Sequence, residues 1–429
     1  MKDLRVLVVS HNVFSRENNM GRSLAGLLSG WDPDALSQLY FCPEQPSLPL
    51  CRRYFRVTDL DALRSLWRRR GQGQALPVDG AAGRVKPPPP AGWIYRLGHR
   101  CRTSLLGLLR DGLWALALWD SPQLQAFLAE ARPDVILFAA GDAVFSHRIV
   151  CRLAVRYRLP VVTVSYDDFY SKPRFSLFGT LHYRLRMGWA RRIIRGGAGL
   201  LVASPAMAEA YAPVFQVPCF PVYTSYAAVR PFSGRPGGVR YFGNLGLGRW
   251  RQLISIGRAL AALRLPGLPP YLEVYSQEDC PHIRKKMLAC PGIRFCGGIS
   301  GSRVARLVSQ SLVVIHTESF APREVRRIRF SLSTKLADYL AFAPCILAYG
   351  PEEAASIAYL RDHRAAVIVS SERELSQGLV DACTQEARRA EVRANARELA
   401  AEHHDPIQVS KQMRAVLARA VAAWKGDKE

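Results

Sequence analysis

The chain has 429 residues, of which 49% are hydrophobic, and a formal net charge of +24. This length is enough for two domains of roughly 200 residues, each with a buried core. No stretch reaches the ~18 uninterrupted apolar residues that a membrane-spanning helix needs, and the start lacks the pattern of a signal peptide, so we expect a cytoplasmic protein.

The positive charge predicts an anionic partner: a nucleic acid, an anionic lipid surface or a phosphorylated substrate. An arginine-rich coding bias is the alternative explanation. The sequence has no zinc finger, RNA-binding motif or aromatic-basic repeat, so we expect no nucleic acid partner. The ten cysteines follow no zinc-binding spacing, and Asp and His do not cluster; we therefore expect no metal and no cofactor.

Strand and helix signals alternate from the start of the chain. Residues 5–10 form an apolar, β-branched run typical of a buried parallel strand, and a polar loop and an amphipathic run at 22–28 follow it. Further strands are predicted at 39–41, 54–57, 133–138, 160–164 and 200–203. Residues 71–92 are rich in Gly and Pro and predict a surface loop.

Gly and Pro accumulate again between Pro221 and Gly238, where we place a domain boundary. Strands are then predicted at 239–242, 272–275, 293–295, 312–316, 345–348 and 366–369, with helices between them. Repeated βα units imply parallel sheets with helices on both faces. We therefore predict an α/β chain of two doubly wound, Rossmann-like domains facing a cleft, 1–230 and 231–400. A C-terminal helix over 401–429 follows, with packing back on the first domain as one option.

Three stretches of the second half resemble bacterial GT-B glycosyltransferases, specifically the group 1 or family-4-like enzymes that build exopolysaccharides and lipid-linked oligosaccharides. They are Tyr241-Phe242-Gly243-Asn244-Leu245-Gly246-Leu247-Gly248-Arg249-Trp250, then Phe295-Cys296-Gly297-Gly298 with its following helix and strand, then the segment from Glu318 through Ser333-Thr334-Lys335 to Pro351. The resemblance implies a hexosyltransferase that moves sugar from a nucleotide diphosphate to a lipid-linked or polysaccharide acceptor. Such an enzyme would be peripheral on the inner face of the cell membrane.

The donor-binding residues implied by these stretches are Gly243, Asn244, Gly246, Arg249, Gly297, Glu318, Ser333, Thr334 and Lys335. Glycines before a helix let backbone N–H groups approach a diphosphate, and Arg249 adds a charge-assisted contact. Ser333 or Thr334 is expected to cap the next helix, and Lys335 to neutralise the departing diphosphate. The alternatives are an ordinary βα turn and a solvated lysine.

Glu318 is the acidic residue that the resemblance places near the sugar or ribose hydroxyls. Many relatives carry a second glutamate eight positions later, where this chain has Arg326 in a basic segment, 321–329, that reads as a loop. A salt bridge from Glu318 to those arginines is the alternative role. The missing glutamate keeps two other functions open, an inactive relative that acts as a binding subunit and a nucleotide-sugar epimerase of the same fold.

In the first half, the loop after the first strand carries His11, Asn12, Asn19 and Gly21, which are candidates to approach the diphosphate and the acceptor. Asp142 and Asp168 follow strand ends and are candidate general bases, because carboxylates at the carboxyl ends of parallel strands face the ligand crevice. The alternative for each is helix capping. We assign the catalytic set to Asp142, Asp168, Glu318 and Lys335.

Basic, aromatic and amphipathic stretches at 93–96, 105–119 and 183–195 fit an anionic membrane interface. Ordinary packing of a helix on the sheet is the alternative.

Overall fold

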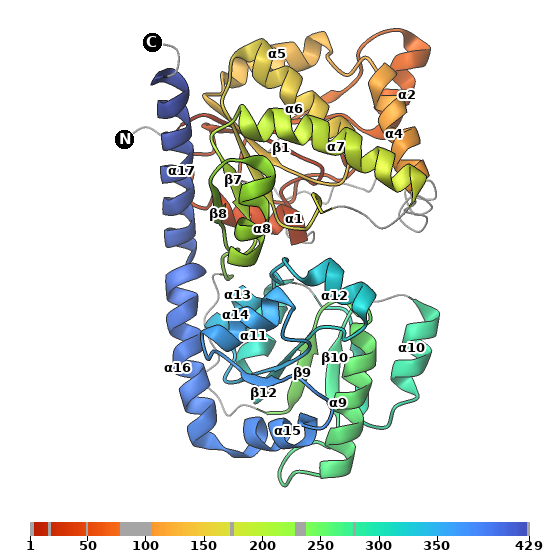
Figure 1. Cartoon of the computed structure of the whole chain (residues 1–429), viewed down its shortest axis with the longest axis vertical. Coiled ribbons are helices and arrows are strands. Elements are labelled where there is room, and N and C mark those ends of the chain that lie inside the picture. Colours follow the sequence, from red (N-terminus) through yellow and green to blue (C-terminus); the bar gives the residue numbers. More distant parts are fainter. Residues whose placement is uncertain are drawn as a thin grey trace. The chain divides into compact units, whose positions relative to one another are not determined.

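The computed structural model describes residues 4–15, 19–48, 50–77, 104–171, 176–227, 237–277, 280–299 and 301–426 (Figure 1). The chain forms two compact units, one of Met1–Val222 with Ser410–Glu429 and one of Tyr223–Val409. The division therefore falls eight residues before the boundary placed from the sequence, and the chain returns to the first unit at Ser410. Each unit is built on a sheet with flanking helices, which confirms the predicted α/β class.

A sheet of eight strands forms the centre of the first unit, in the order β4-β3-β2-β1-β5-β6-β7-β8. The strands are β1 (Val6–Ser10), β2 (Leu36–Tyr40), β3 (Arg53–Arg56), β4 (Gln74–Pro77), β5 (Val135–Ala139), β6 (Val161–Ser165), β7 (Leu200–Val202) and β8 (Cys219–Pro221). Only β4 runs antiparallel to its neighbour. The order reverses between β1 and β5, so the carboxyl ends of these two strands form a topological switch point, where open α/β sheets bind ligands.

The helices of the first unit begin at recognisable sequence signals. They are α1 (Asn19–Leu27), α2 (Asp59–Arg68), α4 (Ser104–Leu116), α5 (Pro122–Ala131), α6 (Val144–Tyr157), α7 (Leu177–Arg195) and α8 (Pro205–Phe215). Thr58 and Asp61 form a capping box at α2, and Ser121 and Ser204 cap α5 and α8 just before a proline.

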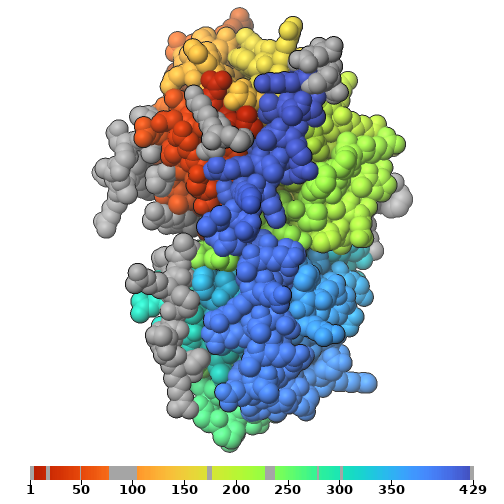
Figure 2. Space-filling view, turned by 90° about the vertical axis from the view of Figure 1, so that its left-hand side faces the viewer, coloured from red at the N-terminus to blue at the C-terminus, as the bar shows by residue number. Residues whose placement is uncertain are grey.

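The last helix, α17 (Pro406–Gly426), belongs to the first unit from Ser410 onward. Met413 and Leu417 are buried. The Ser410 hydroxyl donates to the carbonyl of Ser29, and the Arg414 guanidinium donates to the carbonyl of Gly30 at 2.7 Å. Figure 2 shows this end of the chain, in dark blue, on the surface of the unit beside segments from near the N-terminus.

The second unit has a parallel sheet of six strands in the order β11-β10-β9-β12-β13-β14. The strands are β9 (Val239–Phe242), β10 (Leu272–Tyr275), β11 (Ile293–Gly297), β12 (Val313–Thr317), β13 (Ile346–Tyr349) and β14 (Val367–Val369). Counted along the chain this is the order 3-2-1-4-5-6 of dinucleotide-binding folds. The switch point of this sheet lies between β9 and β12.

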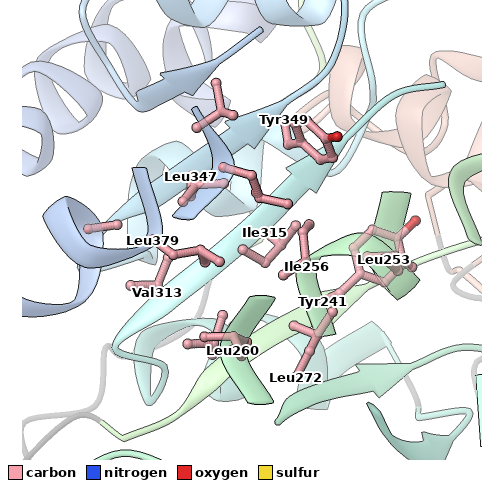
Figure 3. Packing of buried hydrophobic residues seen from close by; sticks show 14 of the residues in the cluster. Tyr241, Leu253, Ile256, Leu260, Leu272, Val313, Ile315, Leu347, Tyr349 and Leu379 are labelled. Carbon is pink, nitrogen blue, oxygen red and sulfur yellow. The ribbon is translucent and has the colours of Figure 1, made fainter. Parts of the chain in front are cut away.

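Side chains alternate between two cores along the strands of this second sheet, as period-two geometry requires. Val313 and Ile315 of β12 join a cluster with Leu253 of α9 and Leu379 of α15 (Figure 3), whereas Val314 joins the other cluster. The helices are α9 (Arg249–Leu263), α10 (Pro281–Leu288), α11 (Gly301–Ser309), α12 (Pro322–Ile328), α13 (Leu336–Phe342), α14 (Ala355–Asp362), α15 (Leu375–Thr384) and α16 (Glu386–His403). Both faces of the sheet are thus covered. Helices α9, α10 and α15 contribute to one core and α11, α13 and α14 to the other, and α16 contributes to both.

Candidate functional site

The candidate site of the second unit lies at the carboxyl ends of β9 and β12. The turn that follows β9 ends at Gly248, which is the N-cap of α9 and has a φ of 77°. A Cβ added to Gly248 would lie 2.6 Å from the Oγ of Ser319, which follows β12. Only glycine fits both this backbone conformation and this approach. The start of α9 is therefore held against the end of β12.

A buried ion pair joins the two strand ends. Arg249 is the first residue of α9, and its Nε and Nη2 donate to Oε2 and Oε1 of Glu318 at 2.9 and 3.0 Å. Glu318 is 2% exposed, so its negative charge depends on this bidentate partner. The sequence assigned both side chains to a ligand, and its alternative paired Glu318 with arginines of 321–329. In the structure the Glu318 carboxylate instead pairs with the Arg249 guanidinium.

The ammonium of Lys335 lies beside this pair. Its Nζ is 4.2 Å from the centroid of the Tyr241 ring, and among the described residues no carboxylate lies within ion-pair distance of it. Burial of the ammonium, helped by the positive charge of Arg249 and opposed by Glu318, lowers the pKa of Lys335 to about 7, although the residue as a whole keeps some exposed surface. An anion that binds beside this desolvated ammonium would stabilise its charged form.

Tyr339 fixes the segment that carries Lys335. Its hydroxyl donates to the carbonyl of Phe242 at 3.0 Å and accepts from the N–H of the same residue at 3.3 Å. These two bonds attach α13 to the end of β9. The backbone at Lys335, which precedes α13, is therefore held close to Tyr241 at the end of β9.

His316 is a component of the site that the sequence analysis did not single out. It lies in β12, is fully buried, and its Nε2 is 2.9 Å from the Oγ of Ser356 and 3.9 Å from Oε1 of Glu318. Burial and the charges of Lys335 and Arg249 lower the pKa of His316 well below its usual value, so the imidazole is neutral. A histidine inside an otherwise apolar buried strand is the signal that could have identified it.

Two local predictions in this region are wrong. Neither Ser333 nor Thr334 caps α13: its N-cap is Lys335, with no side-chain capping bond. The segment 321–329 is mostly the helix α12, because Pro322 stands at its first turn with Glu324, and Arg326 and Arg327 occupy its last turn. Proline in the first turn, an acidic first turn and a basic last turn are helix signals. The segment was nevertheless read as a loop because of its many basic residues.

The remaining donor-binding candidates lie on loops of the second unit. Gly243 and Asn244 are exposed directly after β9, and the side-chain oxygen of Asn244 accepts from the N–H of Gly246. Gly297 ends β11, which is two strands away from β9 in the sheet. Gly243, Asn244 and Gly246 thus lie at the switch point, and Gly297 lies away from it.

In the first unit, the candidates follow three adjacent strands of the sheet. His11 and Asn12 follow β1, Asp142 follows β5 and Asp168 follows β6. Gly21, in α1, lies where a Cβ would be 2.1 Å from the carbonyl oxygen of Val13, so its absence of a side chain lets α1 lie directly on the first loop. Asn19 is the first residue of α1, and its side chain lies outside the described part of the structure.

The two candidate bases have different surroundings. Asp142 is exposed, and its backbone oxygen accepts from the guanidinium of Arg186 at 3.0 Å. The Oδ1 of Asp168 instead accepts from the Tyr211 hydroxyl at 2.6 Å and from the N–H of Ser171 at 3.0 Å. The helix after Asp142 has Ala143 as its N-cap, without a side-chain bond. Asp142 is therefore the more accessible carboxylate, and Asp168 holds its own turn together.

Metal and membrane features can be assessed over the same described ranges. No group of three or more His, Cys, Asp or Glu side chains there is arranged to hold a metal ion. Within those ranges, too, every helix is too short or too polar to cross a bilayer. The sequence stretch 93–96 lies outside the described residues, whereas 105–119 and 183–195 fall largely on α4 and α7.

Comparison with known proteins gives two kinds of match. Residues 251–415 match the family model described as "Glycosyl transferase-like". No curated protein matches the chain. Among solved structures, HepE of Anabaena in complex with UDP is similar, with a TM-score of 0.63, 12% identity, and coverage of 97% of this chain and 100% of HepE. The complex of HepE with UDP-glucose gives 0.60, 14%, 96% and 99%. The α,α-trehalose 6-phosphate synthase of Burkholderia multivorans gives 0.60, 13%, 100% and 99%.

Proposed function

From the premise that residues 251–415 are a glycosyl transferase-like domain in a chain with the GT-B fold, we propose that the protein is a glycosyltransferase. Its donor is a nucleotide-diphosphate sugar, bound by the second unit. Its acceptor is a lipid-linked or polysaccharide molecule at the inner face of the cell membrane, and the transferred group is a hexose.

The observation that carries this proposal is the Lys335 ammonium beside the Arg249–Glu318 pair. All three side chains lie at the switch point of a sheet with the dinucleotide-binding strand order, where ligand phosphates bind in such folds. A buried cation without its own carboxylate is costly unless an anion completes it. A diphosphate supplies that anion, and the crystallised complexes of HepE with UDP and UDP-glucose support this choice.

Lys335 then contributes to the transfer step. The bond between the sugar and the diphosphate breaks with growing negative charge on the departing oxygen. An ammonium held at that position stabilises the transition state more than the ground state, because the charge is larger there. The Arg249–Glu318 pair keeps the guanidinium oriented, and the neutral His316 avoids a third positive charge behind it.

The acceptor hydroxyl must lose a proton to a base if the reaction inverts configuration. Asp142 is our candidate for this role, because its carboxylate is exposed at the carboxyl edge of β5, whereas Asp168 is occupied by Tyr211. We propose no metal ion and no cofactor, since Lys335 and Arg249 carry the positive charge that the leaving group needs.

The missing second glutamate favours one competing function, a relative that binds a nucleotide sugar without turnover. An epimerase is the other, and it would release an isomerised nucleotide sugar without any acceptor. Both competing functions would use the same donor site. The binding subunit would form no product, and the epimerase would form an isomerised nucleotide sugar.

The test is a donor screen by thermal shift followed by product analysis. A nucleotide sugar at 100 times its dissociation constant adds about 2.7 kcal/mol to the free energy of unfolding. We expect a shift with one of the UDP or GDP sugars, loss of the shift in Lys335→Ala, and no loss in the matched control Lys285→Ala, an exposed lysine of α10. Release of nucleoside diphosphate with a membrane acceptor extract supports transfer. Binding without product, or an isomerised sugar nucleotide, contradicts it, and a normal shift in Lys335→Ala would refute the assignment of the site.

A further inference from the structure

Three helices of the first unit each turn an apolar stripe outwards. On α2 the stripe is Leu60, Leu63 and Trp67, spaced to lie on one side of a helix, and Trp67 is 93% exposed. The buried residues of this helix, Ala62 and Ser65, lie on the opposite side. An amphipathic helix in a soluble protein normally turns its apolar stripe to the core, so this orientation is reversed.

The same reversal occurs on α4, whereas α7 buries Met187, Ala190 and Ile193 on its core side and carries a second apolar stripe outwards in its N-terminal half. The exposed residues of α4 include Leu109 and Leu116, and its buried residues include Asp111 and Trp114 on the other side. The exposed apolar residues of α7 begin with Leu177, which is 81% exposed. We define the leucine face by the exposed apolar residues of these helices: Leu60, Leu63 and Trp67 of α2, Leu105, Leu106, Leu109 and Leu116 of α4, and Leu177, Phe178, Leu181 and Leu185 of α7.

The three helices that carry these stripes are neighbours in the unit. The Oδ1 of Asp59, in α2, accepts from Arg110 Nε at 2.8 Å and from Trp114 Nε1 at 2.7 Å, both in α4. His182 Nε2, in α7, lies 2.9 Å from the Oδ2 of Asp111, in α4. Figure 1 shows α2, α4 and α7 together at one end of the unit. Single exposed leucines are common, but eleven apolar side chains on adjacent helices mark an interaction surface.

Positive charge borders the leucine face. The exposed arginines on or just after these helices are Arg64, Arg68, Arg69 and Arg70 near α2 and Arg184, Arg191, Arg192 and Arg195 on α7. Helix α7 has no acidic residue, and the acidic residue of α4, Asp111, is buried. Helix α2 has two acidic residues: Asp59 is exposed but paired with Arg110, and Asp61 belongs to the capping box. The rim of the face is therefore basic.

We propose that the leucine face docks on the surface of an anionic lipid bilayer. Apolar side chains that enter the boundary between headgroups and acyl chains, with arginines around them that meet anionic headgroups, are the two components of interfacial binding. A second copy of this chain would bring two basic rims together, which repel. A nucleic acid would meet leucines, which offer no surface for base stacking. This inference rests on the proposed function only for its purpose, which is to bring the first unit to a membrane-held acceptor.

The first experiment tests the apolar stripes by flotation of the full chain with vesicles of phosphatidylcholine and phosphatidylglycerol. The test variant carries Trp67→Ser, Leu109→Gln and Leu177→Gln, one change on each helix. The control variant carries Leu288→Gln and Ile407→Gln, because Leu288 is 61% exposed in α10 and Leu109 is 62% exposed. We expect the partition coefficient of the test variant to fall more than about tenfold, since each large side chain loses its transfer into the interface. The control variant is expected to partition like the wild type.

The second experiment tests the basic rim. The variant Arg68→Glu/Arg184→Glu is compared with Arg258→Glu/Arg373→Glu, two exposed arginines of the second unit. The rim variant should lose at least about tenfold in partitioning, because each basic residue at an anionic surface contributes about 1 kcal/mol. Added salt should weaken the wild type in the same direction, and vesicles of phosphatidylcholine alone should recover less protein than the anionic ones.

Three results would overturn the proposal: equal recovery of wild type with neutral and anionic vesicles, equal partitioning of the stripe variant and wild type, or a self-association of the wild type that the stripe variant abolishes while vesicle binding is unchanged. The last result assigns the face to a second copy. Thermal shift with nucleotide sugar, measured on the same stripe variant, separates this inference from the proposed function. A normal donor shift without vesicle binding refutes only the leucine face, and vesicle binding without any donor shift refutes only the function.

Discussion

Removal of Arg249 should unfold the second unit more readily than removal of both members of its ion pair. In Arg249→Met the carboxylate of Glu318 loses both of its 2.9 and 3.0 Å donors while its side chain stays 3% exposed. A buried charge left without its partner costs about 3–5 kcal/mol. For a unit of this size, 1 kcal/mol corresponds to roughly 2–4 °C in Tm, so we expect a decrease on the order of 10 °C.

The double variant Arg249→Met/Glu318→Leu removes both charges and keeps the volume. Replacement of a complete buried pair by apolar side chains is often neutral or stabilising, so the double variant should melt near the wild type. The two single variants and the double variant form a thermodynamic cycle. Because Arg249→Met alone costs about 3–5 kcal/mol and the double variant is near neutral, we expect a coupling of at least about 3 kcal/mol between the two positions. Thermal and urea unfolding of all four proteins gives this value.

The cycle also separates stability from function. If the pair orients Arg249 for the donor, the stable double variant should show no nucleotide-sugar shift. An Arg249→Met variant within about 0.5 kcal/mol of wild type would refute the buried pair itself, because surface substitutions have effects of that size. A double variant with a normal donor shift would leave the pair a purely structural role.

Four further results are expected. Lys335→Ala should reduce turnover by ~10²–10³ while Tm changes little, as measured by initial rates beside thermal melts; near-normal turnover would refute a catalytic role. Because the pKa of Lys335 is lowered to about 7 in the folded chain, the unfolded chain binds one more proton above that pH, and the free energy of unfolding should rise as pH rises from 7 towards 10. Donor affinity needs the ammonium, so it should fall over the same pH range in the wild type and stay level in Lys335→Arg. Gly21→Ala should lower stability by about 1–3 kcal/mol because its Cβ meets the Val13 carbonyl, while Gly112→Ala on α4, with nothing within 4 Å, should not; equal melts would refute the close approach. Turnover should survive EDTA, and a loss that Mg²⁺ or Mn²⁺ restores would contradict the metal-free proposal.

The alternation of apolar strands with amphipathic helices was sufficient to predict two doubly wound sheets. Runs such as 6–9 and 313–315 carry this information locally, because a buried parallel strand must be apolar on both faces. The same local pattern cannot give strand order. The neighbours β9 and β12 are separated by more than seventy residues, and their adjacency depends on packing of the whole unit.

The sequence also identified Arg249, Glu318 and Lys335 as residues of one region, but not their mutual geometry. A pattern of charged residues cannot distinguish a side chain that waits for a ligand from one that is already paired. Glu318 and Arg249 are 69 positions apart, and only the adjacency of their strands brings them together. His316 could have been noticed as a polar residue in an apolar strand, but its contacts with Ser356 and Glu318 depend on the folded sheet.

The return of α17 to the first unit has a consequence for biosynthesis. Met413 and Leu417 complete the hydrophobic interior of a unit whose remaining residues end at Val222. A ribosome has therefore synthesised the entire second unit before the first one can reach its final structure. During translation the second unit can fold as soon as residue 409 has emerged, whereas the first unit must wait with an exposed apolar surface where α17 will bind. Co-translational folding of this chain should thus finish at the unit that began first.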